Sequence, residues 1–251
     1  MSRRVQVGFS QRIQLDWLEY TSRLLLSGSK QGEIKTALDD FLQDKLSVGS
    51  KTKSTNRRNA ISILLKIWVS VPEKLEPLRN EGLEHLRRLP LNEHLPVHWG
   101  MTMAVYPFFG VVAETVGRLL RLQGSIAAAS AQKRIREKLG ERETVSRATR
   151  RVLRCFVDWG VLQDTKVKGV YQAAPVRLVE DKKLAAWLIE AALVASDSDT
   201  AALKVLAQTP ALFPFAVSQL NLTALAASER LELFRQGLDE NMVILRGRGQ
   251  G

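Results

Sequence analysis

Apolar residues recur three or four positions apart along most of this chain, which is the spacing of amphipathic helices. Two such runs come early, and the connection 28–30 contains a glycine, so a helical hairpin is expected. The apolar positions are Trp17, Leu18, Leu24, Leu25 and Leu26, then Ile34, Leu38, Phe41, Leu42 and Leu46. A polar linker at 49–53 precedes Ser54, which we expect to cap a third helix.

The same pattern continues to residue 109. Leu75, Leu78, Leu83 and Leu86 belong to a further helix or helix pair. Residues 95–109 are apolar almost throughout, so this stretch is expected to form the buried centre of an N-terminal domain.

Residues 111–175 have the order of a winged helix-turn-helix, with three helices followed by a hairpin. The first helix is expected to stop near Gly124, and the second to run from a cap at Ser125 to Gly140. Thr144 is the expected N-cap of the third helix. Strands at 161–163 and 170–172, joined by a basic turn at 164–169, form the expected wing.

The last part of the chain changes to alanine- and leucine-rich runs at 184–195, 201–207 and 222–234, which predict a small helical bundle or a dimerisation surface. A strand is expected at 242–245, followed by a disordered tail; segment 5–9 is one candidate partner for the strand, and the pairing is left open. The predicted fold class is therefore mainly α. It comprises a helical N-terminal domain (1–109), a central winged helix-turn-helix (110–178) and a helical C-terminal extension (179–251).

The third helix of the central domain carries a row of arginines. Arg147, Arg150, Arg151 and Arg154 are spaced so that a helix places them within an arc of about 100°. The opposite face has the apolar residues Val145, Ala148, Val152, Leu153, Phe156 and Val157. Arg150 and Arg151 have no acidic residue three or four positions away, whereas Glu143 and Asp158 reach the outer two arginines. Arginine binds phosphates and guanine edges in bidentate fashion, so this row indicates a polyanion-binding face.

Other polar residues extend the predicted interface. Thr144 and Ser146 lie near the start of the arginine helix, and Lys166 and Lys168 lie near the tip of the wing, where they are expected to contact backbone phosphates. A second phosphate-contacting patch is expected around the start of the third N-terminal helix, or else these residues belong to a solvated linker. The patch comprises Lys51, Lys53, Arg57 and Arg58.

The net charge of +11 is unevenly distributed along the chain. Residues 1–110 carry +5, residues 111–178 carry +8 and residues 179–251 carry −2. The positive charge is therefore concentrated where the arginine helix lies, and a field of this sign attracts polyanions.

Catalytic motifs are not found. His94 and His98 have the spacing of a helical metal pair, but Pro96 lies between them and no cysteine or further histidine is at hand, so no metal site is expected. Asp39 and Asp40 are adjacent and diverge on a helix. The sequence also has no P-loop, no dinucleotide-binding fingerprint and no motif typical of a catalytic serine or threonine nucleophile. We therefore expect a binding protein that is not an enzyme and uses no cofactor.

The remaining features suggest a soluble protein. Cys155 is the single cysteine, which excludes an intrachain disulfide, favours a reducing cytoplasmic setting and suits a packing role. The N-terminus has no apolar signal-peptide core, and the longest apolar stretch, 101–113, is too short to span a bilayer. No membrane partner is expected.

Five short segments together resemble the BrxA family, the small helical subunit of BREX bacteriophage-exclusion systems. The segments are 24–28 (LLLSG), 53–58 (KSTNRR), 146–153 (SRATRRVL), 159–162 (WGVL) and 173–175 (AAP). The resemblance covers roughly residues 15–195 and implies a non-catalytic DNA-binding component of a prokaryotic defence system. By this resemblance, the family's pattern includes Arg57, Arg58, Arg150 and Arg151 of this chain. The chain departs from the family in its longer C-terminal extension from about residue 196, which leaves partner contacts and oligomeric state open.

The sequence as a whole predicts a protein that binds double-stranded DNA, with other subunits of a defence complex as further partners. Two alternatives remain: a protein-docking or scaffold subunit whose basic face meets an acidic partner, and a transcriptional regulator. RNA binding is less favoured because no exposed aromatic stacking platform is found. DNA sequence preference is left open.

Overall fold

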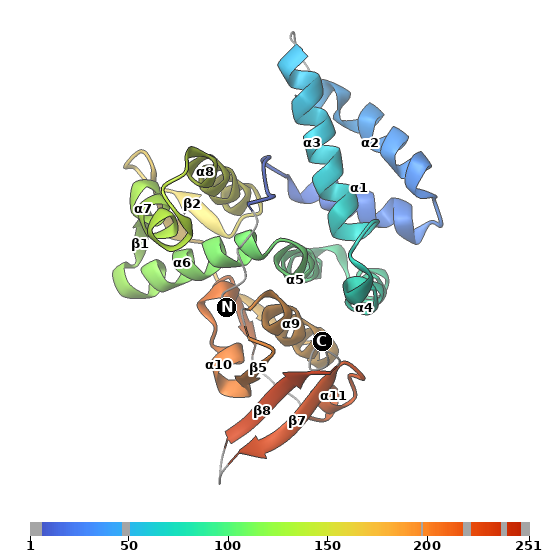
Figure 1. Cartoon of the computed structure of the whole chain (residues 1–251), viewed down its shortest axis with the longest axis vertical. Helices are drawn as coiled ribbons and strands as arrows, with labels where there is room; N and C mark the ends of the chain where they lie inside the picture. Colours follow the sequence, from blue (N-terminus) through green and yellow to red (C-terminus); the bar gives the residue numbers. More distant parts are fainter. Residues whose placement is uncertain (1–6, 47–50, 197, 218–221, 237–239, 247–251) are drawn as a thin grey trace.

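The computed structural model describes residues 7–46, 51–196, 198–217, 222–236 and 240–246, without the side chains of 51–54. It begins with α1 (Leu15–Leu26) and α2 (Gln31–Leu46), which form the expected hairpin, and α3 (Lys51–Trp68) packs against both (Figure 1). The expected cap at Ser54 is wrong because α3 already begins at Lys51, which places Ser54 inside the helix.

Two short 3-10 turns, η1 (Glu73–Leu75) and η2 (Leu91–Glu93), flank α4 (Glu76–Arg88). The next helix, α5 (Leu95–Val105), is buried at every residue, as the apolar stretch predicted. Pro96 lies in its first turn, where its missing N–H and fixed φ are tolerated. Helix α5 therefore forms the centre of the molecule, between α1, α3 and α4 on one side and the C-terminal part on the other.

Among the described residues, no single helix is long and apolar enough to cross a membrane. One pair of helical segments, 91–105 and 107–123, passes that test only when taken together, and it bends by 118° at the break.

The central part contains three helices and three short strands. They are α6 (Pro107–Gln123), β1 (Ser125–Ala127), α7 (Ala128–Leu139), α8 (Glu143–Asp158), β2 (Leu162–Asp164) and β3 (Val170–Ala173). The strands form one antiparallel sheet in the order β1-β3-β2. Gly124 and Gly140 end α6 and α7 with positive φ angles of 70° and 99°, as expected.

Two expected caps in this part are wrong. Ser125 is the first residue of β1, because its neighbour Ile126 pairs with Tyr171 of β3 and is buried there. Thr144 is the second residue of α8, whose N-cap position is occupied by Arg142 without a side-chain hydrogen bond. The helix therefore begins two residues earlier than the sequence predicted.

The C-terminal part mixes helices and strands. After β4 (Arg177–Val179) come α9 (Lys182–Ala195), β5 (Thr200–Ala202), α10 (Leu203–Ala207), η3 (Pro210–Leu212), β6 (Phe215–Val217), α11 (Leu222–Ala226), β7 (Leu231–Gln236) and β8 (Glu240–Leu245). Helix α9 is confirmed, whereas the run 201–207 is helical only from Leu203 and the run 222–234 only as far as Ala226, so the expected all-helical bundle is wrong. Strand β8 was expected, but its neighbours are β5 and β7 instead of 5–9. The expected disordered tail, 247–251, lies outside the described residues.

One hydrophobic cluster contains buried side chains from all three predicted parts of the chain. Trp99 of α5 contacts Phe109 of α6 and Phe156 of α8, and its indole N–H donates to the carbonyl of Ala211 at 3.1 Å. Trp187 of α9 donates to the carbonyl of Leu78 in α4 at 2.9 Å. These contacts join the parts through a shared core, and the division at residues 109 and 178 stays a prediction.

Helix α9 begins at an ion pair that links it to α4. Asp181 accepts the N–H of Leu184 at 2.8 Å as the N-cap, and it accepts hydrogen bonds from Arg88 at 2.6 and 2.9 Å. The bonds from Arg88 are the main reason that the pKa of Asp181 falls from 3.8 to about 2.

This pKa shift predicts a specific loss of stability in acid. Because the folded pKa is below the unfolded one, the carboxylate stabilises the fold above about pH 4, and this contribution disappears as the pH falls from 4 to 2. We expect Asp181→Asn, which keeps a capping oxygen, to lose less unfolding free energy than the wild type between pH 5 and pH 2.5. Urea unfolding at both pH values measures this, and equal losses would contradict the assignment.

Candidate nucleic-acid interface

Helix α8 has a sharply divided surface. Val145, Ala148, Val152, Leu153 and Phe156 are buried against α6, α7 and the aromatic side chains around Trp99, as the apolar pattern predicted. The remaining face carries the arginines and is open to solvent at Arg147 and Arg150. Burial of the apolar face fixes the rotation of the helix and thereby determines which arginines point outward.

The four arginines have different surroundings. Arg147 has half of its side chain exposed (53%) and pairs with Glu143, one turn earlier, at 3.2 Å. Arg150 is exposed and makes no hydrogen bond or ion pair with any described residue. Arg154 lies 3.4 Å from Asp164 of β2, which connects the helix to the wing. Arg147 and Arg150 are therefore the most accessible guanidinium groups of the row.

Arg151 departs from the expected arrangement because it is half-buried under the N-terminal segment 7–14. Its guanidinium donates to the carbonyl of Ser10. Burial lowers the pKa of Arg151, and repulsion by Arg147 and Arg150 lowers it further. The expectation that Arg151 faces solvent with the rest of the row is wrong, since Arg151 attaches the N-terminal segment to α8.

The same segment contacts α8, or the residue that follows it, at three further points. The N–H of Ile13 donates to Sγ of Cys155 at 3.2 Å, and the indole of Trp159 donates to the carbonyl of Ile13 at 2.9 Å. Cys155 is fully buried, and burial raises its pKa to about 12, so its thiol is a packing group as expected. Arg12 pairs with Asp158, which was expected to reach Arg154 instead.

The other polar residues predicted on this face lie near the start of α8. Thr144 is exposed in the first turn, and Ser146 is partly exposed one residue before Arg147. The first backbone N–H groups of a helix have no partner one turn earlier within the helix, and they favour an anion at this end. Thr144 and Ser146 are thus on the accessible end of the helix, although Thr144 is not its cap.

The segment predicted to be the wing is a tight turn between β2 and β3. Thr165 Oγ1 donates to the carbonyl of Val170 at 3.0 Å, and Gly169 closes the turn with a φ of 79°. Lys166 and Lys168 are both exposed at the tip. The ion pair of Arg154 with Asp164, at the end of β2, places the base of this turn beside α8.

The second predicted patch is only partly accessible. The side chain of Arg57 is 18% exposed and pairs with Asp39 of α2 at 2.8 Å, so it holds α3 against α2. Arg58 contacts the hydroxyl of Thr55 at 3.5 Å, one turn earlier on α3. Lys53 lies in the first turn of α3, and its side chain is outside the described set. Arg57 therefore has a structural role in joining α3 to α2, and its contact with phosphate stays a prediction.

Sequence reasoning omitted basic residues of α7, the helix that precedes the arginine row. Lys133 and Arg134 are exposed on α7, and the guanidinium of Arg142, in the turn to α8, donates to the carbonyl of Leu139 at 3.2 Å. The net charge of +8 for residues 111–178 was a signal for them, because the arginine row and the wing account for only part of it. The basic surface therefore includes α7 as well as α8.

Comparisons with known proteins identify no relative of this chain. The chain matches no family model, no curated protein and no solved structure.

Proposed function

We propose that residues 107–173 form a winged helix-turn-helix that binds double-stranded DNA, with α8 as the helix that enters the major groove. Arg147 and Arg150 contact the groove, and Lys166 and Lys168 contact phosphates from the wing. Arg154 lies between the two arginines and the two lysines. Thr144 and Ser146, at the start of α8, lie near phosphates of the bound DNA. The chain acts in this proposal as a binding protein without catalytic activity.

The order of the elements supports the proposal. A helix, a short strand, two helices and a hairpin follow one another, and the hairpin pairs with the first strand to give the sheet β1-β3-β2. Winged helices place their third helix across the groove and their hairpin beside the backbone. In this chain the third helix and the hairpin both carry exposed cationic side chains, and α7 adds Lys133 and Arg134.

The observation that carries the proposal is the state of Arg150. It is exposed at the middle of α8 with no partner among the described residues, between Arg147 and Arg154, which have weak or solvent-exposed ion pairs. Exposed pairs of this kind contribute about 0–1 kcal/mol, so phosphate groups of DNA compete with Glu143 and Asp164 for these arginines. A face with this composition favours a polyanion over bulk solvent.

Fluorescence anisotropy with a labelled DNA duplex at several salt concentrations tests the proposal. With four to six phosphate contacts, we expect the affinity to fall by about 100- to 2,000-fold between 50 and 200 mM salt. A single strand of the same length is the matched control, and it is expected to bind more weakly. No binding to duplex at 50 mM salt, or binding that salt does not weaken, would contradict the proposal.

We further propose that this DNA binding serves a prokaryotic defence system of the BREX type, beside other subunits. This assignment rests on the five short segments that resemble the BrxA family. Two of its motifs belong to the proposed DNA-binding region: 146–153 lies in α8 and contains Arg147 and Arg150, and 159–162 leads into β2.

A protein-docking role is the second candidate, and the strand that follows the wing favours it. Val176 and Leu178 expose 58% and 54% of their surface on either side of the exposed Arg177 in the sequence. Apolar residues next to a charged rim are typical of protein interfaces. In that case the isolated chain would have no affinity for duplex and would bind an acidic protein instead.

A further inference from the structure

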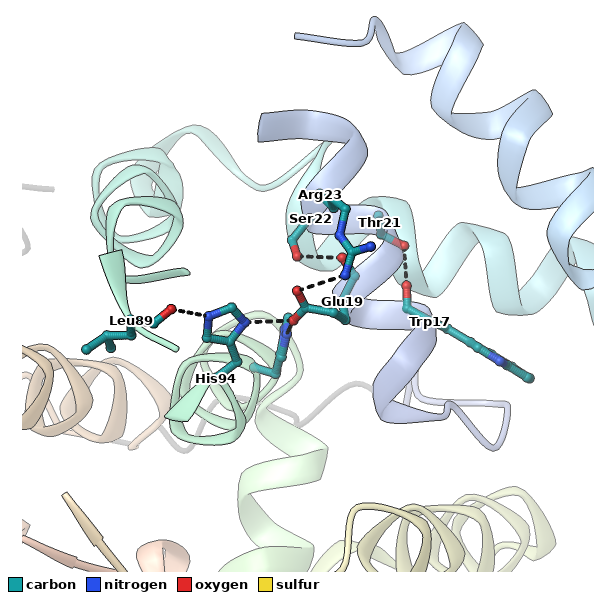
Figure 2. Close-up of polar contacts among 8 residues, drawn as sticks. Trp17, Glu19, Thr21, Ser22, Arg23, Leu89 and His94 are labelled. Atoms are coloured by element: carbon teal, nitrogen blue, oxygen red, sulfur yellow. Dashed lines mark hydrogen bonds and ion pairs between the residues drawn. The ribbon is translucent and has the colours of Figure 1, made fainter. Parts of the chain in front are cut away.

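Three titratable side chains meet outside the proposed DNA-binding region. Oε2 of Glu19, on α1, lies 2.9 Å from Nδ1 of His94 and 2.9 Å from Nε2 of His98. One ligand atom from each residue lies within 4.8 Å of the others, and both histidines are buried. Figure 2 shows the Glu19 carboxylate pointing to the His94 ring, which bridges it to Leu89.

The fold explains why the two histidines converge. His94 is the N-cap residue of α5 and His98 lies one turn into it, and Pro96 between them occupies the first turn without interrupting the helix. Helix α1 packs against α5 and brings Glu19 to the pair from 75 residues away along the chain. The sequence argument that Pro96 separates the histidines is therefore wrong, and it also lacked the third residue.

The hydrogen bonds of His94 require a positive charge beside Glu19. Nε2 lies 2.9 Å from the carbonyl of Leu89 and Nδ1 lies 2.9 Å from the Glu19 carboxylate, and both of these partners are acceptors. A neutral imidazole has one N–H, so it satisfies only one of the two contacts. The other contact needs a cation between Nδ1 and Oε2, which is either a second proton or a metal ion.

The surroundings of His98 are compatible with the same arrangement. Its ring is fully buried, and Nδ1 has no hydrogen-bond partner among the described residues. Thr102 lies one turn further along α5, and its buried hydroxyl also has none. When Nε2 of a histidine binds a metal, Nδ1 carries the N–H of the ring and becomes a donor. The hydroxyl oxygen of Thr102, one turn away on the same helix face, is an acceptor suited to such a donor.

We propose that Glu19, His94 and His98 bind one divalent transition-metal ion, with Zn²⁺ as the best match. Two imidazole nitrogens and one carboxylate oxygen form a ligand set that suits zinc. The carbonyl of Leu89 accepts the remaining N–H of His94, which is the outer-shell contact that orients metal-binding histidines. The ion takes the place of the protons that now join the histidines to Oε2.

The position of the cluster leaves a further coordination site accessible. All three residues line a cavity of about 490 Å³, whose wall also includes Tyr20 and Phe41. Structural zinc sites have four protein ligands, whereas sites with three keep one position for water or another small ligand. Arg23 lies 3.7 Å from the other carboxylate oxygen of Glu19, but its side chain is exposed and free to turn away.

Metal uptake by the full-length chain tests the proposal. After treatment with a chelator and dialysis, the protein is titrated with Zn²⁺ and, separately, with Co²⁺, whose visible absorption reports a low-coordinate site. We expect one ion per chain and a rise in Tm with Zn²⁺. A dissociation constant weaker than about 10 µM, or no uptake, would overturn the proposal and leave a hydrogen-bonded carboxylate–imidazole cluster.

Single substitutions identify the ligands. Glu19→Gln and His98→Gln are expected to weaken binding by roughly 100-fold or more, because even outer-shell losses cost about 10- to 100-fold. His85→Gln is the matched control, since His85 is the third histidine of the chain and packs against Trp187 instead. Equal weakening by His85→Gln, or unchanged binding by Glu19→Gln, would refute the site.

X-ray absorption of the zinc-loaded wild type does not depend on whether the variants fold. We expect two imidazole ligands at about 2.0–2.1 Å and no sulfur ligand. Zinc–sulfur scattering would assign the metal to Cys155, and fewer than two imidazoles would assign it elsewhere; either result overturns the proposal. This test is independent of DNA binding.

Discussion

Replacing Arg147 and Arg150 with glutamate is expected to remove most of the affinity for duplex DNA. Each arginine that contacts a base edge or phosphate is worth about 1–3 kcal/mol, so the double substitution costs about 2–6 kcal/mol of binding free energy. It also removes about two cationic contacts, so the slope of log affinity against log salt becomes shallower by about two. Both effects are measured in the anisotropy titration.

Arg87→Glu is the matched control for this experiment. Arg87 lies on α4, its side chain is 61% exposed, and it pairs with Glu84 one turn earlier, much as Arg147 pairs with Glu143. It changes the net charge of the chain by the same amount per residue. If Arg87→Glu weakened binding as much as Arg147→Glu, only the overall charge would matter and the groove assignment would be wrong.

Arg151 is left out of this variant for a structural reason. Its guanidinium donates to the carbonyl of Ser10, so Arg151→Glu would remove a contact that holds segment 7–14 as well as change the charge of α8. Loss of binding in that variant would not distinguish DNA contact from local unfolding. The exposed positions Arg147 and Arg150 separate the two effects.

Trp99→Ala is expected to cause the largest loss of stability of any single change discussed here. Its fully buried ring contacts Phe109, Phe156, Trp159, Phe213 and Phe215. Removing a buried aromatic ring costs about 3–5 kcal/mol, which is a large part of the 5–15 kcal/mol of a typical protein. Urea unfolding measures the loss.

Two further variants, measured in the same way, help to interpret the result for Trp99→Ala. Trp99→Phe keeps much of the ring packing but removes the donor for the Ala211 carbonyl, so a smaller loss of about 1–3 kcal/mol is expected. Val205→Ala, at a position that is 63% exposed on α10, is expected to stay within about 0.5 kcal/mol of the wild type. A loss below 1 kcal/mol for Trp99→Ala would contradict the shared core.

The sequence predicted best the elements that are specified by local signals. Helix α8 has one apolar face and one cationic face, Gly124 and Gly140 have the backbone freedom that ends a helix, and the wing strands flank a basic turn. Each of these features depends on residues a few positions apart. The accessibility of Arg147 and Arg150 follows from the same helical periodicity.

Features set by distant residues could not be predicted in this way. Strand β1 is three residues long and exists because Ile126 pairs with Tyr171. The run 222–234 divides into α11 and β7 because its second half pairs with β8. Arg151 and Glu19 likewise have their roles through Ser10 and the two histidines, which lie 75 to 141 positions away.

The attachment of segment 7–14 to α8 also imposes an order on biosynthesis. Its contacts with Arg151, Cys155 and Trp159 join residues 141 to 146 positions apart. On a ribosome that adds about 5–20 residues per second, this early-made segment waits roughly 7–30 s before its docking surface has been translated. Until then the nascent chain exposes Phe9 and Ile13, both fully buried in the finished protein, and chaperones that hold apolar peptides have that interval in which to bind them.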